Sequence, residues 1–578
     1  MVQGLSKMFW AIAAMGGFFM AAAAFGQGAI PPPLTVPELP PVAIHVDLSR
    51  GVAPFRPIYS WFGYDEANYT TTPLGRALLD QLRDLSPVPV HIRAHNLLSS
   101  GNGHPELKFS STNVYHEDAQ GRPVYDFTIL DGIFDAYKAE EIEPLVEFGF
   151  MPKDLAAKLP HRPNQPYQVH FPHDVTSGAS NNPPRDYKKW GDLVEAVTAH
   201  LVQRYGRAAV QHWHFEVWNE PDISYWHGSR EDYFRLYDYA AAGVKAALPT
   251  AQVGGPATTG ASNPHAAAYL KAFLDHVESG KSTATGGKVP LDFISFHVKG
   301  RPEISGEHVV MGLNHELSDA SDGFAIIQSF PVFRHLPVIL SEADPEGCAA
   351  CSSRTNPANN YRNGTLYPAY TATAFKGLLD LAQQHQTDLI AMLSWSFEFE
   401  GRDYFEGFRS LSTNGIDKAV LNLFRMLGMM AGERVAVAST GSVPLMTQVT
   451  TGVRGTADVD ALATHDGRRA AVLVWNYHDA AKPAPATPVT VTIQGIPARV
   501  GRVLVENYRI DKTHSNAYAT WLAMGSPQRP STEQYAELKA KEGLQLLGSP
   551  KWVDVKDGAI EVNTNMPRQS VSLLSLSW

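Results

Sequence analysis

The sequence predicts an α/β fold, a (β/α)8 TIM barrel, followed by a C-terminal all-β sandwich domain. Three observations favour this architecture. Short apolar segments alternate with longer amphipathic segments over most of the chain, which is the order of strands and helices around a parallel sheet. Several of the short segments are apolar without alternation, as strands buried on both faces are. From about residue 433 the helical pattern gives way to short strands separated by turn residues.

The barrel is predicted over residues 57–432. Its eight strands are expected at residues 58–64, 88–94, 143–148, 213–218, 252–255, 291–297, 336–341 and 389–396. Helices between them are expected at residues 74–85, 130–139, 190–205, 233–248, 265–279, 367–385 and 418–430. The segment 152–184 is rich in Pro, His and Asn and is predicted to be a long loop over the face where the strands end.

The sandwich is predicted over residues 433–578. Its clearest strands are expected at residues 459–464, 470–477, 489–493 and 571–576. His465-Asp466-Gly467-Arg468 separates the first two and is a hairpin signal. Residues 531–546 are predicted to form one amphipathic helix.

The N-terminus has the pattern of a secretory signal. Lys7 is the only charge before an apolar block from Met8 to Met20, and the small residues that follow suit a signal peptidase. We therefore predict a signal peptide over residues 1–26 and a secreted or periplasmic protein, with an uncleaved membrane anchor as the alternative. Residues 27–56 would begin as an extended Pro-rich leader.

Length and charge narrow the possible partners. A chain of 578 residues, of which 44% are hydrophobic, can form one large domain and a smaller one. The formal net charge of -10 argues against nucleic acid or an anionic membrane as a partner, because both require basic patches. A neutral oligo- or polysaccharide is compatible with this charge. The sequence makes no prediction about the oligomeric state.

Cys348 and Cys351 are the only cysteines of the chain. In an exported protein, a local disulfide is favoured over redox chemistry, although so short a loop is geometrically demanding. Two cysteines without a nearby histidine do not complete a zinc site, and His315-Glu316 lacks the second histidine of a zincin helix. The sequence therefore predicts neither a metal nor an organic cofactor.

Two glutamates follow predicted strands. Glu220 comes after residues 213–218, within Asn219-Glu220-Pro221-Asp222, and Glu342 comes after residues 336–341. They are 122 positions apart (342 minus 220), but the carboxyl ends of all barrel strands meet on one face. A pair of carboxyl groups is what glycoside hydrolysis requires. The alternative is that Asn219 or Asp222 merely caps the next helix.

These residues belong to a wider series of motifs. The others are Ile92-Arg93-Ala94-His95, the segment 144–152, Asp292-Phe293-Ile294-Ser295-Phe296-His297, the segment 507–511 and the segment 514–518. From about residue 44 onward the chain resembles glycoside hydrolase family 39, retaining (β/α)8-barrel enzymes that include β-xylosidases and α-L-iduronidases. The resemblance implies that Glu220 is the acid/base and Glu342 the nucleophile. It also implies that residues 45–48 add a strand to the sandwich.

Other side chains near the predicted strand ends are candidates for substrate binding. The set is Arg93, His95, Asn219, Trp226, His297, Lys299 and Glu398. Arg93 and His95 could instead be a buried hydrogen-bonded pair without a catalytic role. Glu147 and Glu216 would point into the barrel, where an unpaired carboxylate is costly, so we expect each to pair with an Arg or a His.

The identity of the sugar depends on two motifs. His297-Val298-Lys299-Gly300 and Glu342-Ala343-Asp344-Pro345 resemble the iduronidase branch, in which a cation would contact the uronate, whereas Trp395-Ser396-Phe397-Glu398 resembles xylosidases. Lys299 could also be a solvated loop charge. We predict a retaining exo-glycosidase, with β-D-xylosidase first and an α-L-iduronidase-like or arabinoside-active enzyme second. A non-catalytic glycan-binding protein is a further alternative, but it would need neither glutamate.

Overall fold

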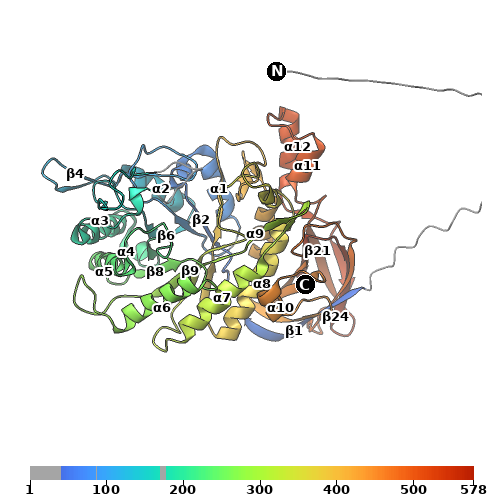
Figure 1. Cartoon of the computed structure of the whole chain (residues 1–578). Helices are drawn as coiled ribbons and strands as arrows, with labels where there is room; N and C mark the ends of the chain where they lie inside the picture. Colours follow the sequence, from blue (N-terminus) through green and yellow to red (C-terminus); the bar gives the residue numbers. More distant parts are fainter. Residues whose placement is uncertain (1–40, 86, 169–177) are drawn as a thin grey trace, which may run out of the picture. The chain divides into compact units, whose positions relative to one another are not determined.

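A computed structural model describes residues 41–85, 87–168 and 178–578 (Figure 1). The signal peptide predicted over residues 1–26, and the leader as far as residue 40, lie outside the described residues. None of the helices in the described ranges combines the length and apolar content that a bilayer span requires.

A ring of parallel strands forms the centre of the first region. In sequence order the strands are β2 (Trp61–Tyr64), β3 (His91–Ala94), β6 (Glu143–Phe148), β7 (His214–Val217), β8 (Gln252–Thr258), β9 (Phe293–Lys299), β12 (Val338–Asp344), β13 (Leu389–Met392) and β14 (Ser394–Trp395). The last two are halves of one strand interrupted at Leu393: β13 pairs with β12, and β14 pairs with β2. This interruption lets the eighth strand connect both ends of the sheet, and the predicted (β/α)8 barrel is confirmed.

Helices surround these strands (Figure 1). They are α1 (Pro73–Arg83), α2 (Thr128–Ala139), α3 (Tyr187–Tyr205), α4 (Arg207–Val210), α5 (Arg230–Ala247), α6 (Pro264–Ser279), α7 (Leu313–Gln328), α8 (Leu366–His385) and α9 (Ala419–Gly428). The sequence did not predict α7. Its buried face includes Glu316 and Asp319 beside Leu317 and Phe324, and these buried acids obscure the apolar stripe by which a helix is recognised.

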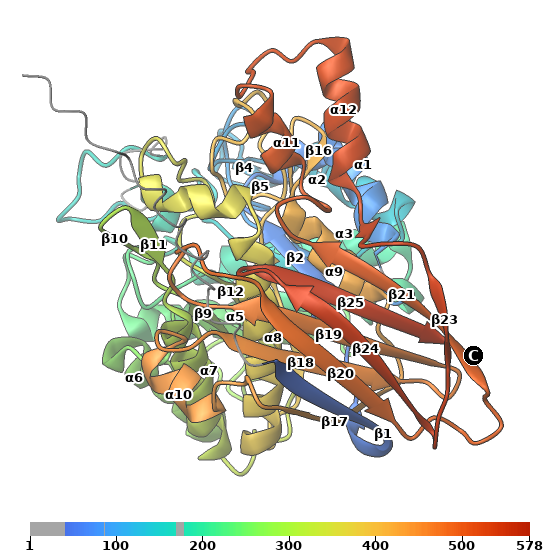
Figure 2. The same ribbon diagram turned by 90° about the vertical axis from the view of Figure 1, so that its right-hand side faces the viewer.

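The second region is a ten-stranded mixed sheet (Figure 2). Its strands are β1 (Val42–Pro54), β17 (Glu433–Ser439), β18 (Asp458–His465), β19 (Arg469–Tyr477), β20 (Thr487–Gln494), β21 (Arg502–Ile510), β22 (Gln545–Leu546), β23 (Lys551–Asp554), β24 (Ala559–Met566) and β25 (Ser570–Ser577). The expected strand at residues 45–48 is present within β1, which pairs antiparallel with β17 and parallel with β20.

Strand β19 is buried on both faces. Leu473 and Trp475 belong to the core shared with the barrel, where α8 lies against β19. Val472 and Val474 face the other way, into a second apolar core that includes Val491 of β20. The central strands of this sheet therefore connect two cores, which holds the sheet firmly against the barrel.

Shorter elements complete the chain. They are the 3-10 helices η1 (Ala67–Thr71), η2 (Ala179–Asn181) and η3 (Pro357–Asn363), the helices α10 (Leu445–Thr451), α11 (Ala517–Ala523) and α12 (Thr532–Glu542), and the strand pairs β4 (Tyr115–Glu117) with β5 (Pro123–Tyr125), β10 (Glu303–Ser305) with β11 (His308–Val310), and β15 (Ser412–Thr413) with β16 (Ile416–Asp417). The helix predicted over residues 531–546 is too long. It ends at Glu542 before Gly543, and residues 545–546 instead pair with β21.

Candidate active site

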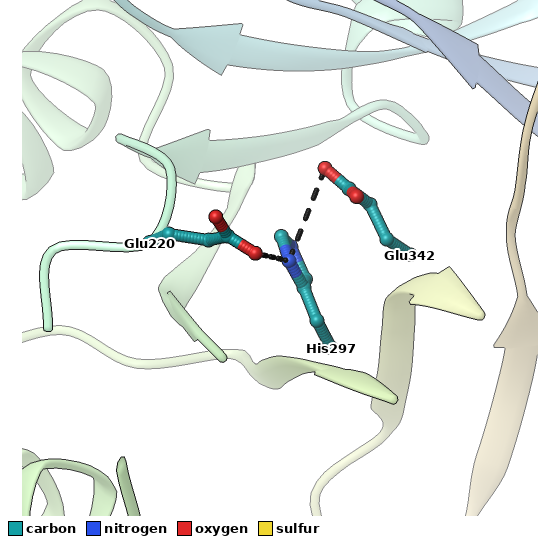
Figure 3. A group of neighbouring side chains, drawn as sticks. All are labelled: Glu220, His297 and Glu342. Carbon is teal, nitrogen blue, oxygen red and sulfur yellow. Dashed lines mark hydrogen bonds and ion pairs between the residues drawn. The ribbon is translucent and has the colours of Figure 1, made fainter. Parts of the chain in front are cut away.

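The carboxyl ends of the barrel strands bring most of the predicted side chains together. The group comprises Arg93, His95, Asn219, Glu220, His297, Lys299 and Glu342. At its centre, the imidazole of His297 lies between the two glutamates (Figure 3). His297 Nδ1 is 2.9 Å from Glu220 Oε1 and 3.9 Å from Glu342 Oε1, and one ligand atom from each of the three residues lies within 4.8 Å of the others.

The backbone that carries Glu220 is strained. Trp218 has φ 74° and Glu220 has φ 42°, values that cost L-residues about 1–3 kcal/mol each. Two hydrogen bonds maintain this conformation: Trp218 Nε1 donates to the carbonyl of Tyr225 at 3.1 Å, and the Glu220 amide donates to the carbonyl of Ala257 at 2.9 Å. The chain therefore leaves the strand abruptly, and the Glu220 carboxylate reaches His297.

The position of Glu342 depends on a bulge. The pairing of β12 with β9 shifts between Leu340 and Glu342, after which Glu342 lies directly opposite His297, and Asp344 opposite Lys299. A bulge re-aims the side chains that follow it. This register places Glu342 within reach of the Lys299 ammonium group on the neighbouring strand β9.

Cations surround Glu342. Its Oε2 is 2.5 Å from Lys299 Nζ, and its Oε1 is 3.2 Å from Arg93 Nη1 and 3.7 Å from His95 Nε2. Burial favours the neutral acid, but Lys299, His297 and Arg93 outweigh burial and hold the pKa of Glu342 well below its usual value. Glu342 is therefore an ionised carboxylate at neutral pH.

Arg93 connects Glu342 and Asn219 to the barrel interior. It is fully buried, with its guanidinium 2.8 Å from Glu147 Oε2, 2.5 Å from Glu216 Oε2 and 2.9 Å from the side-chain oxygen of Asn219. Glu147 and Glu216 thus pair with an arginine, as the sequence predicted. Burial raises the pKa of Glu147, against the opposing effect of Arg93.

His95 is held as a cation. Its Nδ1 is 2.7 Å from Asp65 Oδ1, and its Nε2 is 3.1 Å from Glu147 Oε2. Burial alone would lower the pKa of His95, but Glu147 and Asp65 raise it to about 9. The sequence analysis missed Asp65, although it directly follows β2, the same strand-end position that identified Glu220 and Glu342.

Asp344 is a second residue that the sequence analysis did not assign to the site. Its Oδ2 lies 2.6 Å from Lys299 Nζ and 3.3 Å from Arg409 Nη2, while its Oδ1 accepts a hydrogen bond from the Trp395 amide at 2.9 Å. Lys299 is consequently shared between Glu342 and Asp344. The signal was present in the sequence, because Asp344 is two positions beyond Glu342 and so points to the same face of the strand.

Two predicted substrate-binding residues lie apart from this group. Trp226 is 5% exposed, and its indole packs on Trp218 and donates to the carbonyl of Ser229 at 2.8 Å. Glu398 is 2% exposed, and its carboxylate accepts hydrogen bonds from the side chain of Ser412 at 2.5 Å and the amide of Gly415 at 2.9 Å. Trp226 supports the backbone of the Glu220 loop, and Glu398 holds the turn between β15 and β16.

The group could offer ligands to a metal, but its charges disfavour one. Glu220, His297 and Glu342 present two oxygens and one nitrogen close together. Both oxygens of Glu342, however, already face the cations Lys299 and Arg93, which would repel a divalent ion. In the loop that follows β12, a disulfide bond joins Cys348 and Cys351, the pairing that the sequence favours.

The barrel and its pair of facing glutamates have the architecture of a glycoside hydrolase. The model of the family described as "Glycosyl hydrolases family 39" matches residues 92–545, and the chain belongs to this family of glycoside hydrolases. The predicted family and class of enzyme are thus confirmed.

Individual relatives differ in the substrate that their names state. The chain is 28% identical over 506 residues to a β-xylosidase of Geobacillus stearothermophilus, covering 84% of this chain and 86% of the relative. It is 27% identical over 546 residues to the α-L-iduronidase of Homo sapiens, covering 88% and 75%. A crystal structure of a monomeric β-xylosidase from Caulobacter crescentus CB15 superposes with a TM-score of 0.71 at 23% identity, covering 93% of this chain and 99% of that one, and shares its fold.

Proposed function

We propose that this protein is a retaining exo-glycosidase that removes a terminal β-D-xylosyl residue by double displacement. The observation that carries the proposal is the spacing of the glutamates, since an oxygen of Glu220 and an oxygen of Glu342 lie within 4.8 Å. Carboxyl groups are about 5–5.5 Å apart in retaining enzymes and about 6.5–9.5 Å apart in inverting ones, which need room for a water.

The charges around the pair support distinct roles. Glu342, kept ionised by Lys299 and Arg93, attacks the anomeric carbon while Glu220 protonates the leaving oxygen. In the second step Glu220 removes a proton from water, which attacks the glycosyl–Glu342 ester and releases the sugar with its original configuration.

Asn219 is placed to bind the sugar's 2-hydroxyl. Its side-chain oxygen accepts a hydrogen bond from Arg93 Nη2 at 2.9 Å, which leaves the amide nitrogen as the donor to the substrate. A hydrogen bond that strengthens as the transition state develops would accelerate the reaction.

The neighbours of Lys299 favour a neutral sugar. Its ammonium group already contacts two carboxylates, Glu342 at 2.5 Å and Asp344 at 2.6 Å. A uronate brought to Lys299 would also approach both of these anions, and their repulsion would offset the attraction. A xyloside carries no charged group and avoids this cost.

The second candidate is an α-L-iduronidase-like activity. Lys299 lies at the end of β9, and its side chain remains 16% exposed, so a substrate could reach it. The identity with the human α-L-iduronidase supports this alternative as well. The two candidates use the same pair of glutamates and differ only at the sugar's C5 substituent.

A panel of aryl glycosides tests the proposal. The purified protein should hydrolyse the β-D-xyloside faster than the α-L-arabinoside or α-L-iduronide, and proton NMR should show the β-anomer of xylose as the first product. Release of the α-anomer would refute retention. A preference for the iduronide would replace the proposed sugar, and binding without turnover of any member would indicate a glycan-binding protein.

We further propose that the protein is exported with cleavage after about residue 26. The apolar block from Met8 to Met20 and the disulfide between Cys348 and Cys351 support this, because disulfides persist in oxidising compartments. N-terminal sequencing of the protein recovered from outside the cytoplasm should start near Gln27. An intact N-terminus retained in the membrane fraction would contradict cleavage.

A further inference from the structure

A cavity of about 630 Å³ lies apart from the glutamate pair. This volume is within the range of about 300–1,000 Å³ that small-molecule sites occupy. Its walls are the β10–β11 hairpin, η3 with the start of α8, and loops of the sheet domain at residues 481–484, 511–513 and 567–569 (Figure 2 labels the hairpin). Neither Glu220 nor Glu342 lines it.

The cavity carries positive charge that its surroundings do not neutralise. Lys482 and Lys512 are exposed side chains in its lining, and Arg568 is half-buried there. Arg568 Nε is buried and has no hydrogen-bond acceptor among the residues that the structure describes. Burial lowers the pKa of Arg568, and no carboxylate opposes the effect. Arg362 shows the usual arrangement of a buried arginine, since its Nη2 lies 2.8 Å from the carboxylate oxygen Oε1 of Glu346.

The acidic residues of the lining do not serve as partners. Asp511 Oδ1 accepts hydrogen bonds from the amides of Thr513 at 2.8 Å and His514 at 3.0 Å, so it stabilises its own turn. Glu307 is exposed at the tip of the hairpin and forms no ion pair with a described residue. An anion that entered the cavity would therefore find Arg568 still unpaired.

The rest of the lining suits a sugar. Tyr518 contributes a half-buried aromatic ring, and Pro357, Pro483 and Pro567 add apolar surface. The C–H face of a pyranose packs on such surfaces, while a carboxylate complements an arginine or a lysine. We propose that this cavity binds a saccharide bearing a uronic acid, at a site separate from the catalytic glutamates. The proposal does not depend on which sugar the catalytic site accepts.

Titration calorimetry with methyl β-D-glucuronide tests the site. The wild-type protein should bind it, and methyl β-D-glucoside, which has a hydroxymethyl group in place of the carboxylate, should bind at least about 10-fold more weakly. Lys512→Gln should raise the Kd about 3-fold and Arg568→Gln about 10-fold. Lys281→Gln removes an exposed lysine outside the cavity and should leave the Kd unchanged.

Several outcomes would overturn the proposal. The first is absence of glucuronide binding to the wild type, and the second is equal affinity for the neutral glucoside. The third is competition by acetate as strong as that by the glucuronide, because this would indicate a general anion site. Loss of binding in Lys299→Ala but not in Lys512→Gln would place the uronide in the catalytic pocket instead. Because Lys512 is exposed, its variant keeps the test decisive even if Arg568→Gln fails to fold. Binding is measured without turnover, so failure here is distinguishable from failure of the proposed hydrolysis.

Discussion

The ends of β7 and β12 present the same side chain in different electrostatic surroundings. Glu342, at the end of β12, contacts Lys299 at 2.5 Å and Arg93 at 3.2 Å. Glu220, after β7, contacts His297 at 2.9 Å and forms no ion pair with a lysine or arginine among the described residues. Lysine and arginine side chains thus neutralise the charge of Glu342, whereas Glu220 faces an imidazole and is partly exposed to solvent. The proposed nucleophile and the proposed acid/base thus differ in their surroundings rather than in residue type.

The largest effect should come from removing the glutamates themselves. Glu342→Gln should lower kcat on an aryl glycoside by at least about 10⁴-fold, because the covalent step is lost. Glu220→Gln should lower it by about 10²-fold to 10⁴-fold. Azide should restore activity to Glu220→Ala on a substrate whose leaving group needs no acid. Near-normal turnover by Glu342→Gln would show that Glu342 is not the nucleophile.

The charge of His95, beside Glu342, should make stability depend on pH. Its pKa is raised to about 9 in the folded protein, from an ordinary value of 6.5. The stabilisation is therefore complete below pH 6.5 and is lost as the pH rises through about 9. Urea unfolding should show wild type losing on the order of 3 kcal/mol more than His95→Gln between about pH 6 and pH 10. Parallel losses in the two proteins would mean that His95 is not a cation.

Removing Lys299 should reduce, without abolishing, the difference in charge between the surroundings of Glu342 and those of Glu220. Because Lys299 contacts Glu342 directly, Lys299→Ala should lower kcat/KM for every substrate by about 10-fold and move the acid limb of the pH profile to higher pH. If Lys299 also binds a uronate, the kcat/KM for the iduronide should fall by a further factor of about 10 to 100. Lys281→Ala is the matched control. An unshifted acid limb would show that Lys299 does not set the charge of Glu342.

The loops beyond the two strands also differ. A disulfide closes the loop after β12, whereas the loop after β7 is held by Asp222, which accepts a hydrogen bond from the Thr259 amide at 3.0 Å. Replacing Cys348 and Cys351 with serine should lower the free energy of unfolding by about 2 kcal/mol. Thiol titration of the unreduced, denatured protein should find no free thiol, and two free thiols would remove the covalent difference between the loops.

The sequence by itself determined the barrel and the enzyme family, and it placed Glu220 and Glu342 on one face of the barrel. Strand and helix periodicities are local, and parallel strands bring their carboxyl ends to one face, so a glutamate after a strand could be placed without knowing its neighbours. The cost of burying an unpaired carboxylate correctly predicted that Glu147 and Glu216 pair with a cation. The strand-end argument would also have found Asp65, because this residue directly follows β2.

Only the tertiary structure decided how these residues meet. The bulge that sets Glu342 opposite His297 arises from the pairing of strands distant in sequence, and the left-handed backbone at Glu220 depends on a hydrogen bond to the carbonyl of Ala257. Tertiary packing also places Trp226 and Glu398 apart from the two glutamates, and it gives Lys299 two carboxylate partners. Periodicity shows which side chains share a face, but the distance between two charges depends on strand register and backbone conformation, which packing of the whole barrel determines.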